Sequence, residues 1–228
     1  MGRRAGEAIY DVIVVGGGPA GLSAALVLGR ARRRVLLLDD GRYRNERSRG
    51  VHGYLTRDGV LPEELRRLGR GELRRYGVRT LGARAVDARG NVRAGFHVRV
   101  ASRRTFHARR LLLATGVRDR IPSIPGIETF FGVSIHHCPL CDGWEWRDRR
   151  LAVYGRGAGG ATLAHSRLSW SSDVVLLTDG PARLKPRSAS NLARRRVRVL
   201  TDRVVRLEGR NGRLRRIHFR GGAALERD

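Results

Sequence analysis

Apolar residues near the N-terminus fall into short runs separated by glycines and charges. The β-branched run Val12–Val15 predicts a buried parallel strand, Leu22–Leu28 predicts a helix, and Val35–Leu38 predicts a second strand. Both strands are apolar throughout, so we expect each to lie inside a sheet that is covered on both faces. This order of elements indicates a strand–helix–strand unit with a parallel sheet.

The turn between the first strand and the helix carries three glycines in the order G-x-G-x-x-G. Gly16 would make a tight turn, Gly18 would let backbone N–H groups approach a pyrophosphate, and Gly21 would let the helix pack on the strand. The second strand ends at Asp39, 23 residues after Gly16, close to the spacing of an acid that holds a ribose hydroxyl. Together these features predict a dinucleotide-binding fold.

The same pattern returns in residues 150–180. Leu151–Tyr154 predicts a strand, a helix is expected to run to about Trp170, and residues 173–178 predict the next strand. The equivalent glycines and acid are Gly155, Gly157, Gly160 and Asp179. The chain is therefore predicted to contain two dinucleotide-binding folds.

The remaining segments predict antiparallel β-structure and a connector. Residues 85–116 are typical of short strands with turns, and Asn211-Gly212 predicts a hairpin. Residues 121–127 contain the turn-forming residues of a connector. The predicted fold class is α/β, with two Rossmann-like dinucleotide-binding domains and a β-meander. The expected domain ranges are 1–118 for the first and 119–228 for the second.

Composition and charge add limits on location and partners. Hydrophobic residues make up 41%, and no run of about eighteen apolar residues exists, so we expect no transmembrane helix. Acidic residues interrupt the start of the chain, and two cysteines are too few for a secreted disulfide framework, so we expect a cytoplasmic protein. The net charge of +26 comes almost entirely from scattered arginines, because Lys185 is the only lysine. Without a basic recognition motif, this charge indicates loose attraction to polyanions and no specific nucleic-acid partner.

Both cysteines, Cys138 and Cys141, lie in the segment SIHHCPLCDGWEW. A structural zinc site needs four ligands, whereas this segment offers one cysteine pair and two adjacent histidines that cannot both reach one metal without strain. We therefore expect no metal. A disulfide that closes so short a loop removes little chain entropy, which argues against a plain staple. Thiol–disulfide exchange is the favoured role, with Asp142 placed to move the proton.

Five motifs carry a resemblance to a known family. They are GGGPAG at 16–21, LLLATG at 111–116, IPGI at 124–127, CPLCDG at 138–143 and GRGAGG at 155–160. The chain resembles, over essentially its whole length, the low-molecular-weight thioredoxin reductases of the pyridine nucleotide-disulfide oxidoreductase family. The stretch GRYRNERSRGVHGYLTRDG resembles a branch of close relatives in which His52 and Gly53 lie near the flavin.

The resemblance implies FAD and NAD(P)H as cofactors, with electrons passing from nicotinamide through flavin to the cysteine pair. The residues implied at the FAD site are Gly16, Gly18, Ala20, Gly21, Asp39, His52, Thr115 and Gly116. Those implied at the pyrophosphate of the nicotinamide cofactor are Gly155, Gly157 and Gly160.

The resemblance also implies a role for each redox residue. Cys141 would face the flavin, Cys138 would attack the substrate disulfide, and Asp142 would act as general acid and base between them. The substrate would be a disulfide of a thioredoxin-like protein or of a small molecule. The enzyme would be a homodimer.

One departure from the family concerns the nicotinamide cofactor. Thioredoxin reductases usually follow the second nucleotide strand with a basic cluster for the 2′-phosphate of NADPH, whereas this strand ends LLTDGPARLKPR. Asp179 would favour the free 2′-hydroxyl of NADH and repel a phosphate, although Arg183, Lys185 or Arg187 could still reach one. NADH and NADPH therefore both remain open. The alternative function is a flavin-dependent dithiol oxidase, which shares the fold and the C-P-x-C pair and passes electrons to oxygen.

A second departure lies at the C-terminus. In the family, the chain returns to the flavin domain after the nicotinamide domain, and that return carries a G-D motif and a helix that cover the flavin. The sequence stops at GGAALERD. We therefore expect a truncated member that lacks the return, binds FAD weakly and turns over poorly. A nucleotide-binding remnant with little activity is a further alternative.

Overall fold

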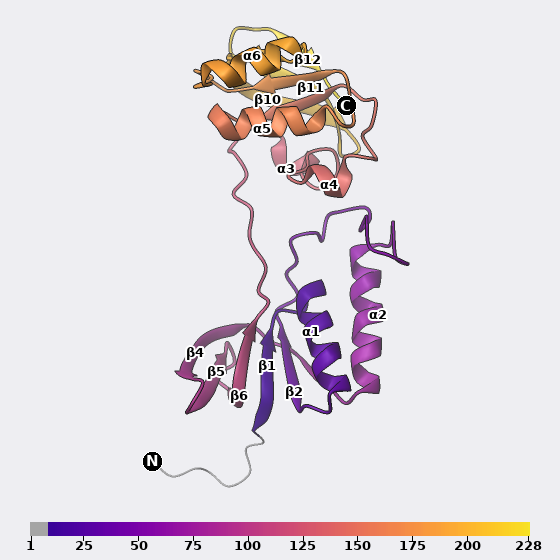
Figure 1. Ribbon diagram of the computed structural model, residues 1–228, viewed down its shortest axis with the longest axis vertical. Coiled ribbons are helices and arrows are strands. Elements are labelled where there is room, and N and C mark those ends of the chain that lie inside the picture. Colours follow the sequence, from indigo (N-terminus) through magenta and orange to yellow (C-terminus); the bar gives the residue numbers. More distant parts are fainter. Residues whose placement is uncertain (1–8) are drawn as a thin grey trace. The chain divides into compact units, whose positions relative to one another are not determined.

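The computed structural model describes residues 9–228, which form two compact units. The first unit contains the described residues up to Glu46 together with Gly59–Asp119 (Figure 1). The second unit contains Arg47–Asp58 and Arg120–Asp228. The chain passes from the first unit to the second after Asp119, next to the domain boundary expected after residue 118. The short segment Arg47–Asp58 instead groups with the second unit, because its side chains contact residues there.

The first unit is built on a six-stranded sheet in the order β3-β2-β1-β6-β5-β4. Its strands are β1 (Tyr10–Val15), β2 (Val35–Asp39), β3 (Arg79–Gly82), β4 (Ala85–Asn91), β5 (Gly95–Val100) and β6 (Thr105–Leu113). The central strands are parallel, and Val14 of β1 lies opposite Leu37 of β2 and Leu112 of β6. β4, β5 and β6 form an antiparallel meander. The carboxyl ends of β1, β2 and β6 therefore meet at one edge of the sheet.

Two helices, α1 (Pro19–Arg30) and α2 (Pro62–Arg75), pack against one face of this sheet (Figure 1). Leu22 of α1 and Leu73 of α2 are buried there, each contributing about 1.5–3 kcal/mol by leaving water. Gly69 of α2 lies against Leu22, where a larger side chain would have little room. On the opposite face, side chains of β1 and β2 pack with side chains of β5 and β6. The residues of that second core are Tyr10, Ile13, Leu36, Leu38, Val98, Val100, Phe106 and Ala108.

The second unit has three layers around a parallel sheet in the order β7-β8-β9. Its parallel strands are β7 (Leu151–Tyr154), β8 (Val174–Leu177) and β9 (Arg198–Leu200). Helices α5 (Gly157–Arg167) and α6 (Pro186–Arg194) cover one face. The other face packs on an antiparallel sheet of β10 (Val204–Arg210), β11 (Arg213–Phe219) and β12 (Ala224–Glu226). Two one-turn helices, α3 (Ile127–Phe130) and α4 (Pro139–Asp142), precede β7 in the chain.

The predicted α/β fold class is confirmed, since a parallel strand–helix–strand pattern occurs in each unit and a meander follows the first. The predicted hairpin is also present, and Asn211 and Gly212 make its turn with φ of 53° and 73°. The helix expected to reach Trp170 ends at Arg167 instead. The chain turns there, and the Ser171 hydroxyl donates a hydrogen bond to the Arg149 carbonyl at 2.5 Å. Among the described residues, no helix has the length and apolarity needed to cross a lipid bilayer.

Candidate functional site

The first glycine turn lies where β1, β2 and β6 end. The N–H of Gly16 donates to the Leu38 carbonyl at 2.7 Å, which fixes the turn against β2. Gly16 has φ of +111°, and a β-carbon there would overlap the carbonyl oxygen of Ala114, just after β6. A β-carbon on Gly21 would overlap the Gly16 carbonyl oxygen in turn. At Gly16 and Gly21 the backbone therefore packs too closely for any side chain, and Thr115 lies directly beside Gly16.

The N-terminus of α1 leaves room for a ligand. Gly18 is its N-cap in an extended conformation, and the space where a β-carbon would lie is open. Pro19 and Ala20 form an exposed first turn, and the N–H groups of a first turn have no acceptor inside the helix. The positive end of the helix dipole adds to their attraction for an anion. The chain then leaves β6 through Gly116, which has φ of +66°.

Asp39, at the end of β2, is almost fully buried, with 8% of its surface exposed. Its Oδ1 accepts the Gly41 N–H at 3.1 Å, and its Oδ2 accepts both the Tyr43 hydroxyl at 2.5 Å and the Arg70 guanidinium at 2.6 Å. Burial alone would raise the pKa of Asp39, but these hydrogen bonds outweigh it and hold the pKa below its ordinary value. Arg66 stacks over the Tyr43 ring at 3.8 Å. Asp39 is thus a fixed anion with one lone pair of Oδ1 left to accept a further donor.

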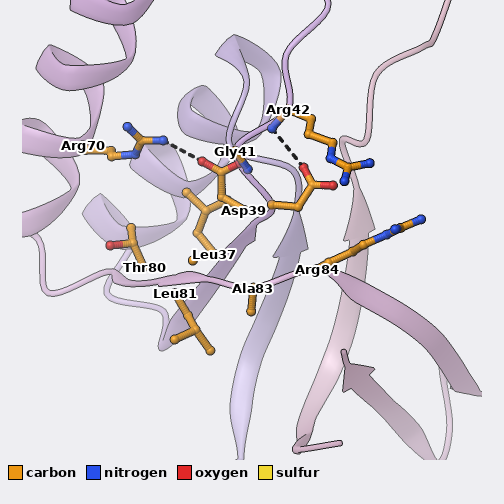
Figure 2. A pocket seen from close by; sticks show the side chains of 11 residues that line it. Leu37, Asp39, Gly41, Arg42, Arg70, Thr80, Leu81, Ala83 and Arg84 are labelled. Carbon is orange, nitrogen blue, oxygen red and sulfur yellow. Dashed lines mark hydrogen bonds and ion pairs between the residues drawn. The ribbon is translucent and has the colours of Figure 1, made fainter. Parts of the chain in front are cut away.

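A cavity of about 460 Å³ opens beside this acid, within the size range of about 300–1,000 Å³ usual for small-molecule sites. Its walls come from the end of β2 and from the connection between β3 and β4. Figure 2 shows Arg70 reaching Asp39 from the helix side, and Arg42 and Arg84 at the other side of the opening. The cavity beside the acid therefore has room for a group such as an adenosine, and its walls are both apolar and cationic.

The second glycine turn repeats the packing of the first. Gly155 donates its N–H to the Leu177 carbonyl of β8 at 2.9 Å, as Gly16 does to β2. A β-carbon on Gly160 would overlap the carbonyl group of Gly155. The equal glycine spacing in the two halves thus reflects the same close contact between strand, turn and helix.

The second turn differs from the first at its middle glycine and at its acid. Gly157 has φ of +56° and donates its N–H to the Ala182 carbonyl at 2.8 Å. The Asp179 carboxylate accepts the Val204 N–H at 2.9 Å and pairs with Arg156 at 3.3 Å. Burial first, and then the hydrogen bond to Asp179, raise the pKa of Tyr154. Asp179 is therefore partly engaged by groups of its own unit, and its charge is balanced by a residue of the turn.

The two cysteines form a disulfide across one turn of helix. Cys138 is the N-cap of α4, and its Sγ accepts the Cys141 N–H at 3.2 Å, with the Cα atoms 5.4 Å apart. Cys141 is exposed and Cys138 is half-buried. Gly143, directly after the helix, packs on the Trp170 ring so closely that a β-carbon would overlap it. This contact fixes the disulfide turn against the end of α5.

Asp142 is joined by a residue that the sequence did not single out for catalysis. Its Oδ1 lies 3.3 Å from Nδ1 of His136, and both side chains are more than four-fifths buried. His136 Nε2 lies 3.2 Å from the Val133 carbonyl oxygen. Burial lowers the pKa of Arg167 on α5, and the nearby charge of Asp142 opposes that effect. The acid expected beside the cysteines therefore has an imidazole and a guanidinium near it.

His52 lies in the second unit, in the segment that groups with it. Its Nδ1 is 3.5 Å from Glu145 Oε1 and 3.8 Å from Asp58 Oδ1. Glu145 follows the cysteine turn, so His52 lies beside that turn within the second unit. Near the cysteines, Leu140 and Trp144 expose 83% and 65% of their surface.

The residues at both turns fit the dinucleotides that the fold implies. At the first turn, the open space at Gly18, the α1 N-terminus and the free lone pair of Asp39 fit the pyrophosphate and ribose of FAD. At the second turn, the start of α5 fits a pyrophosphate, because the space beside Gly159 is open. The acid that would hold the ribose at this turn, Asp179, is paired with Arg156. Within residues 9–228, no three His, Cys, Asp or Glu side chains are grouped so as to hold a metal ion.

Comparison with known proteins agrees with this arrangement. The family described as pyridine nucleotide-disulphide oxidoreductase matches residues 10–225. A probable thioredoxin reductase of Arthroderma benhamiae is 43% identical over 177 residues, 75% of this chain and 44% of that protein. A solved structure of the putative thioredoxin reductase TrxB from Bacillus anthracis is 34% identical, with a TM-score of 0.89 over 96% of this chain and 73% of that chain. The structure of HlmI is 38% identical, with a TM-score of 0.91 over 96% and 70%.

This chain spans about half the length of the first curated relatives it matches, 44% of one and 56% of the next. The family match nevertheless covers residues 10–225, which include both glycine turns and the cysteine turn. The chain therefore belongs to the pyridine nucleotide-disulphide oxidoreductase family, as a thioredoxin reductase-like member.

Proposed function

We propose that the chain is an FAD-dependent disulfide oxidoreductase that passes electrons from NAD(P)H through flavin to the Cys138–Cys141 pair and on to a disulfide substrate. The observation that carries this proposal is the disulfide across the single turn of α4, with Asp142 next to it. So short a bridge adds little stability. Its position on a turn beside an acid suits repeated opening and closing instead.

The thiol chemistry of the pair follows from the two sulfurs. In the reduced pair, the Cys138 thiolate attacks one sulfur of the substrate disulfide, which forms a mixed disulfide and releases one substrate thiolate. The Cys141 thiolate then attacks Cys138 Sγ, which restores the Cys138–Cys141 disulfide and releases the second thiolate. Two electrons leave the pair, and both released thiolates take up protons. Asp142 acts as the general acid and base for these transfers.

We propose that FAD is held by the first glycine turn, its acid and the end of β6. The residues in that proposal are Gly16, Gly18, Ala20, Gly21, Asp39, Thr115 and Gly116. His52, from the second unit, is added by the family resemblance alone, as a residue near the flavin. FAD, when bound, would supply the two-electron carrier that reduces the cysteine pair. The α1 N-terminus would bind its pyrophosphate, Asp39 would accept a ribose hydroxyl, and the cavity beside Asp39 would take the adenosine.

The second turn is proposed to take the nicotinamide dinucleotide, with Gly155, Gly157, Gly160 and Asp179 as its residues. The substrate is proposed to be the disulfide of a thioredoxin-like protein or of a small molecule. The protein substrate is supported by relatives that are named as thioredoxin reductases. By the same family resemblance, we propose a homodimer.

A flavin-dependent dithiol oxidase is the second candidate, and two contacts of the second glycine turn favour it. Gly157 donates its N–H to the Ala182 carbonyl, and Arg156 shares the Asp179 carboxylate. A nicotinamide dinucleotide would have to fit beside these contacts. If it does not, the pair would take electrons from a dithiol substrate and pass them through flavin to oxygen.

An anaerobic titration of the purified flavin-loaded chain separates these functions. Bleaching of the flavin absorbance near 450 nm by NADPH or NADH is the result expected for the reductase (about two electrons per flavin). Bleaching by a dithiol alone, with oxygen restoring the colour, would favour the oxidase. A chain that retains no flavin after dialysis against excess FAD would contradict both.

A further inference from the structure

The contact between His136 and Asp142 requires a proton of its own. Nε2 of His136 lies 3.2 Å from the Val133 carbonyl oxygen. A carbonyl oxygen only accepts hydrogen bonds, so Nε2 must carry the hydrogen. In a neutral imidazole, Nδ1 is then a lone pair.

That lone pair would face Asp142 Oδ1 at 3.3 Å. A carboxylate oxygen is also an acceptor, and two acceptors repel each other at this separation in a site shielded from water. The contact is favourable in only two forms. Either Nδ1 is protonated and the pair is imidazolium–carboxylate, or Oδ1 is protonated and donates to Nδ1. In both forms the two residues share one proton.

Three side chains lie near the pair. The Arg167 guanidinium on α5 interacts with the charge of Asp142. The Trp146 ring lies 5.9 Å from the His136 ring and contributes no charge. The neighbouring His137 stacks with Phe131. The contact itself therefore carries the inference that one proton is shared between His136 Nδ1 and Asp142 Oδ1.

We propose that His136 and Asp142 act as one acid–base unit, in which His136 is the positioning residue that stores the proton for Asp142. This inference rests on the proposed function of the cysteine pair. When the first substrate thiolate leaves, the shared proton passes through Asp142 to its sulfur. When Cys141 closes the disulfide, the proton of its thiol refills the unit, and the second substrate thiolate takes its proton from water. Each turnover therefore leaves the unit with the proton it started with and consumes one proton from solvent.

The test uses the leaving thiol as a probe of proton transfer. An aliphatic thiolate is a poor leaving group and needs a proton, whereas an aromatic nitrothiolate leaves readily without one. The chain of residues 1–228 is reduced with dithiothreitol and desalted under nitrogen. It is then mixed with hydroxyethyl disulfide or with 5,5′-dithiobis(2-nitrobenzoate). Quenched samples are alkylated, and mass spectrometry follows closure of the Cys138–Cys141 disulfide from pH 5 to 9.

His136→Asn keeps an amide that can donate to Asp142 but cannot store a proton. We expect it to slow closure with hydroxyethyl disulfide about tenfold or more, toward the lower end of general acid–base effects, and to flatten the pH dependence. Closure with the aromatic disulfide should change less than about threefold, because its leaving group needs no acid. His137→Asn is the matched control and should behave as wild type with both reagents.

The outcomes separate this inference from the proposed function. Equal slowing with both disulfides would mean that His136 only supports the turn, and an unchanged pH profile would mean that Asp142 works alone. Either result overturns the proton-sharing unit and leaves the thiol chemistry intact. Rapid consumption of either disulfide by Cys138→Ser would contradict the proposed function itself.

Discussion

Replacing Asp39 with asparagine tests whether the first unit depends on a buried, charged acid at the end of β2. The variant keeps one acceptor oxygen but loses the charge that binds Arg70 at 2.6 Å and Tyr43 at 2.5 Å. A hydrogen bond to a charged group is worth about 1.5–3 kcal/mol. Arg70 is 38% exposed and can turn to water, so the loss of the two bonds should sum to about 2–3 kcal/mol of unfolding free energy.

The position of the tryptophans allows this loss to be assigned to one unit. All three, Trp144, Trp146 and Trp170, lie in the second unit. The tryptophan fluorescence transition in urea should therefore stay where it is in Asp39→Asn. The far-UV circular dichroism transition should gain an earlier phase, whose midpoint lies about 1–2 M urea below that of wild type for a unit of this size. Asp40→Asn is the control, because its exposed carboxylate accepts a local N–H, from Arg42 at 3.2 Å, and forms no other hydrogen bond or ion pair within residues 9–228.

The difference in unfolding free energy between wild type and Asp39→Asn should depend on pH, because the pKa of Asp39 is lowered. A depressed pKa adds stability that is fully present above the unfolded value of about 3.9 and is lost as the pH falls through the lower folded value. The gap between wild type and Asp39→Asn should therefore be constant from pH 5 to 7 and shrink below about pH 4. A shift of the fluorescence transition equal to that of the dichroism transition would refute this reasoning, as would a gap that widens in acid.

Three further predictions concern the redox site and the second turn. Cys138→Ser and Cys141→Ser should each abolish disulfide reduction. The flavin charge-transfer band should appear in Cys138→Ser, where Cys141 remains. If the band appeared in Cys141→Ser alone, the roles of the two cysteines would be reversed. Asp142→Asn should lower turnover by roughly 10²–10⁴-fold while flavin absorbance per chain stays unchanged, and full activity would reduce Asp142 to a turn former. Asp179→Ser should raise the ratio of NADPH to NADH use about tenfold, since one charge removed near a phosphate is worth about 1–1.4 kcal/mol. A wild type that already prefers NADPH strongly in steady-state assays would contradict that last prediction.

The sequence predicted most accurately the short strands that are apolar throughout. Leu151–Tyr154 was placed without error as β7, because this apolar run is bounded by the charge of Arg150 and the turn glycine Gly155. The helix α2 went unpredicted, because arginines and the glycines Gly69 and Gly71 dilute its apolar face to Leu65, Leu68 and Leu73. Only its packing on α1, with Gly69 against Leu22, explains why glycine is tolerated there.

The candidate site was predictable wherever a residue type and a spacing together specify chemistry. The glycines, the cysteines and Asp142 meet that condition. His136 does not, because its role depends on a carbonyl at Val133 that fixes its tautomer, and no sequence pattern encodes that contact. The same limit applies to Arg70, which reaches Asp39 from 31 positions further along the chain. Partners brought by tertiary packing leave no local signal.

The two glycine turns show how one sequence motif acquires two electrostatic settings. Each turn is followed by a strand that ends in an acid, and in each case an arginine neutralises that acid. In the first unit the cation is Arg70, which comes from α2 and does not belong to the glycine turn. In the second it is Arg156, which belongs to the turn and lies on the Asp179 carboxylate. Removing Asp179 would therefore free a guanidinium at the place where a 2′-phosphate is expected, so the gain in NADPH use should be lost again in Asp179→Ser/Arg156→Ala. A double variant that retains the gain would show that repulsion by Asp179 alone had disfavoured the phosphate.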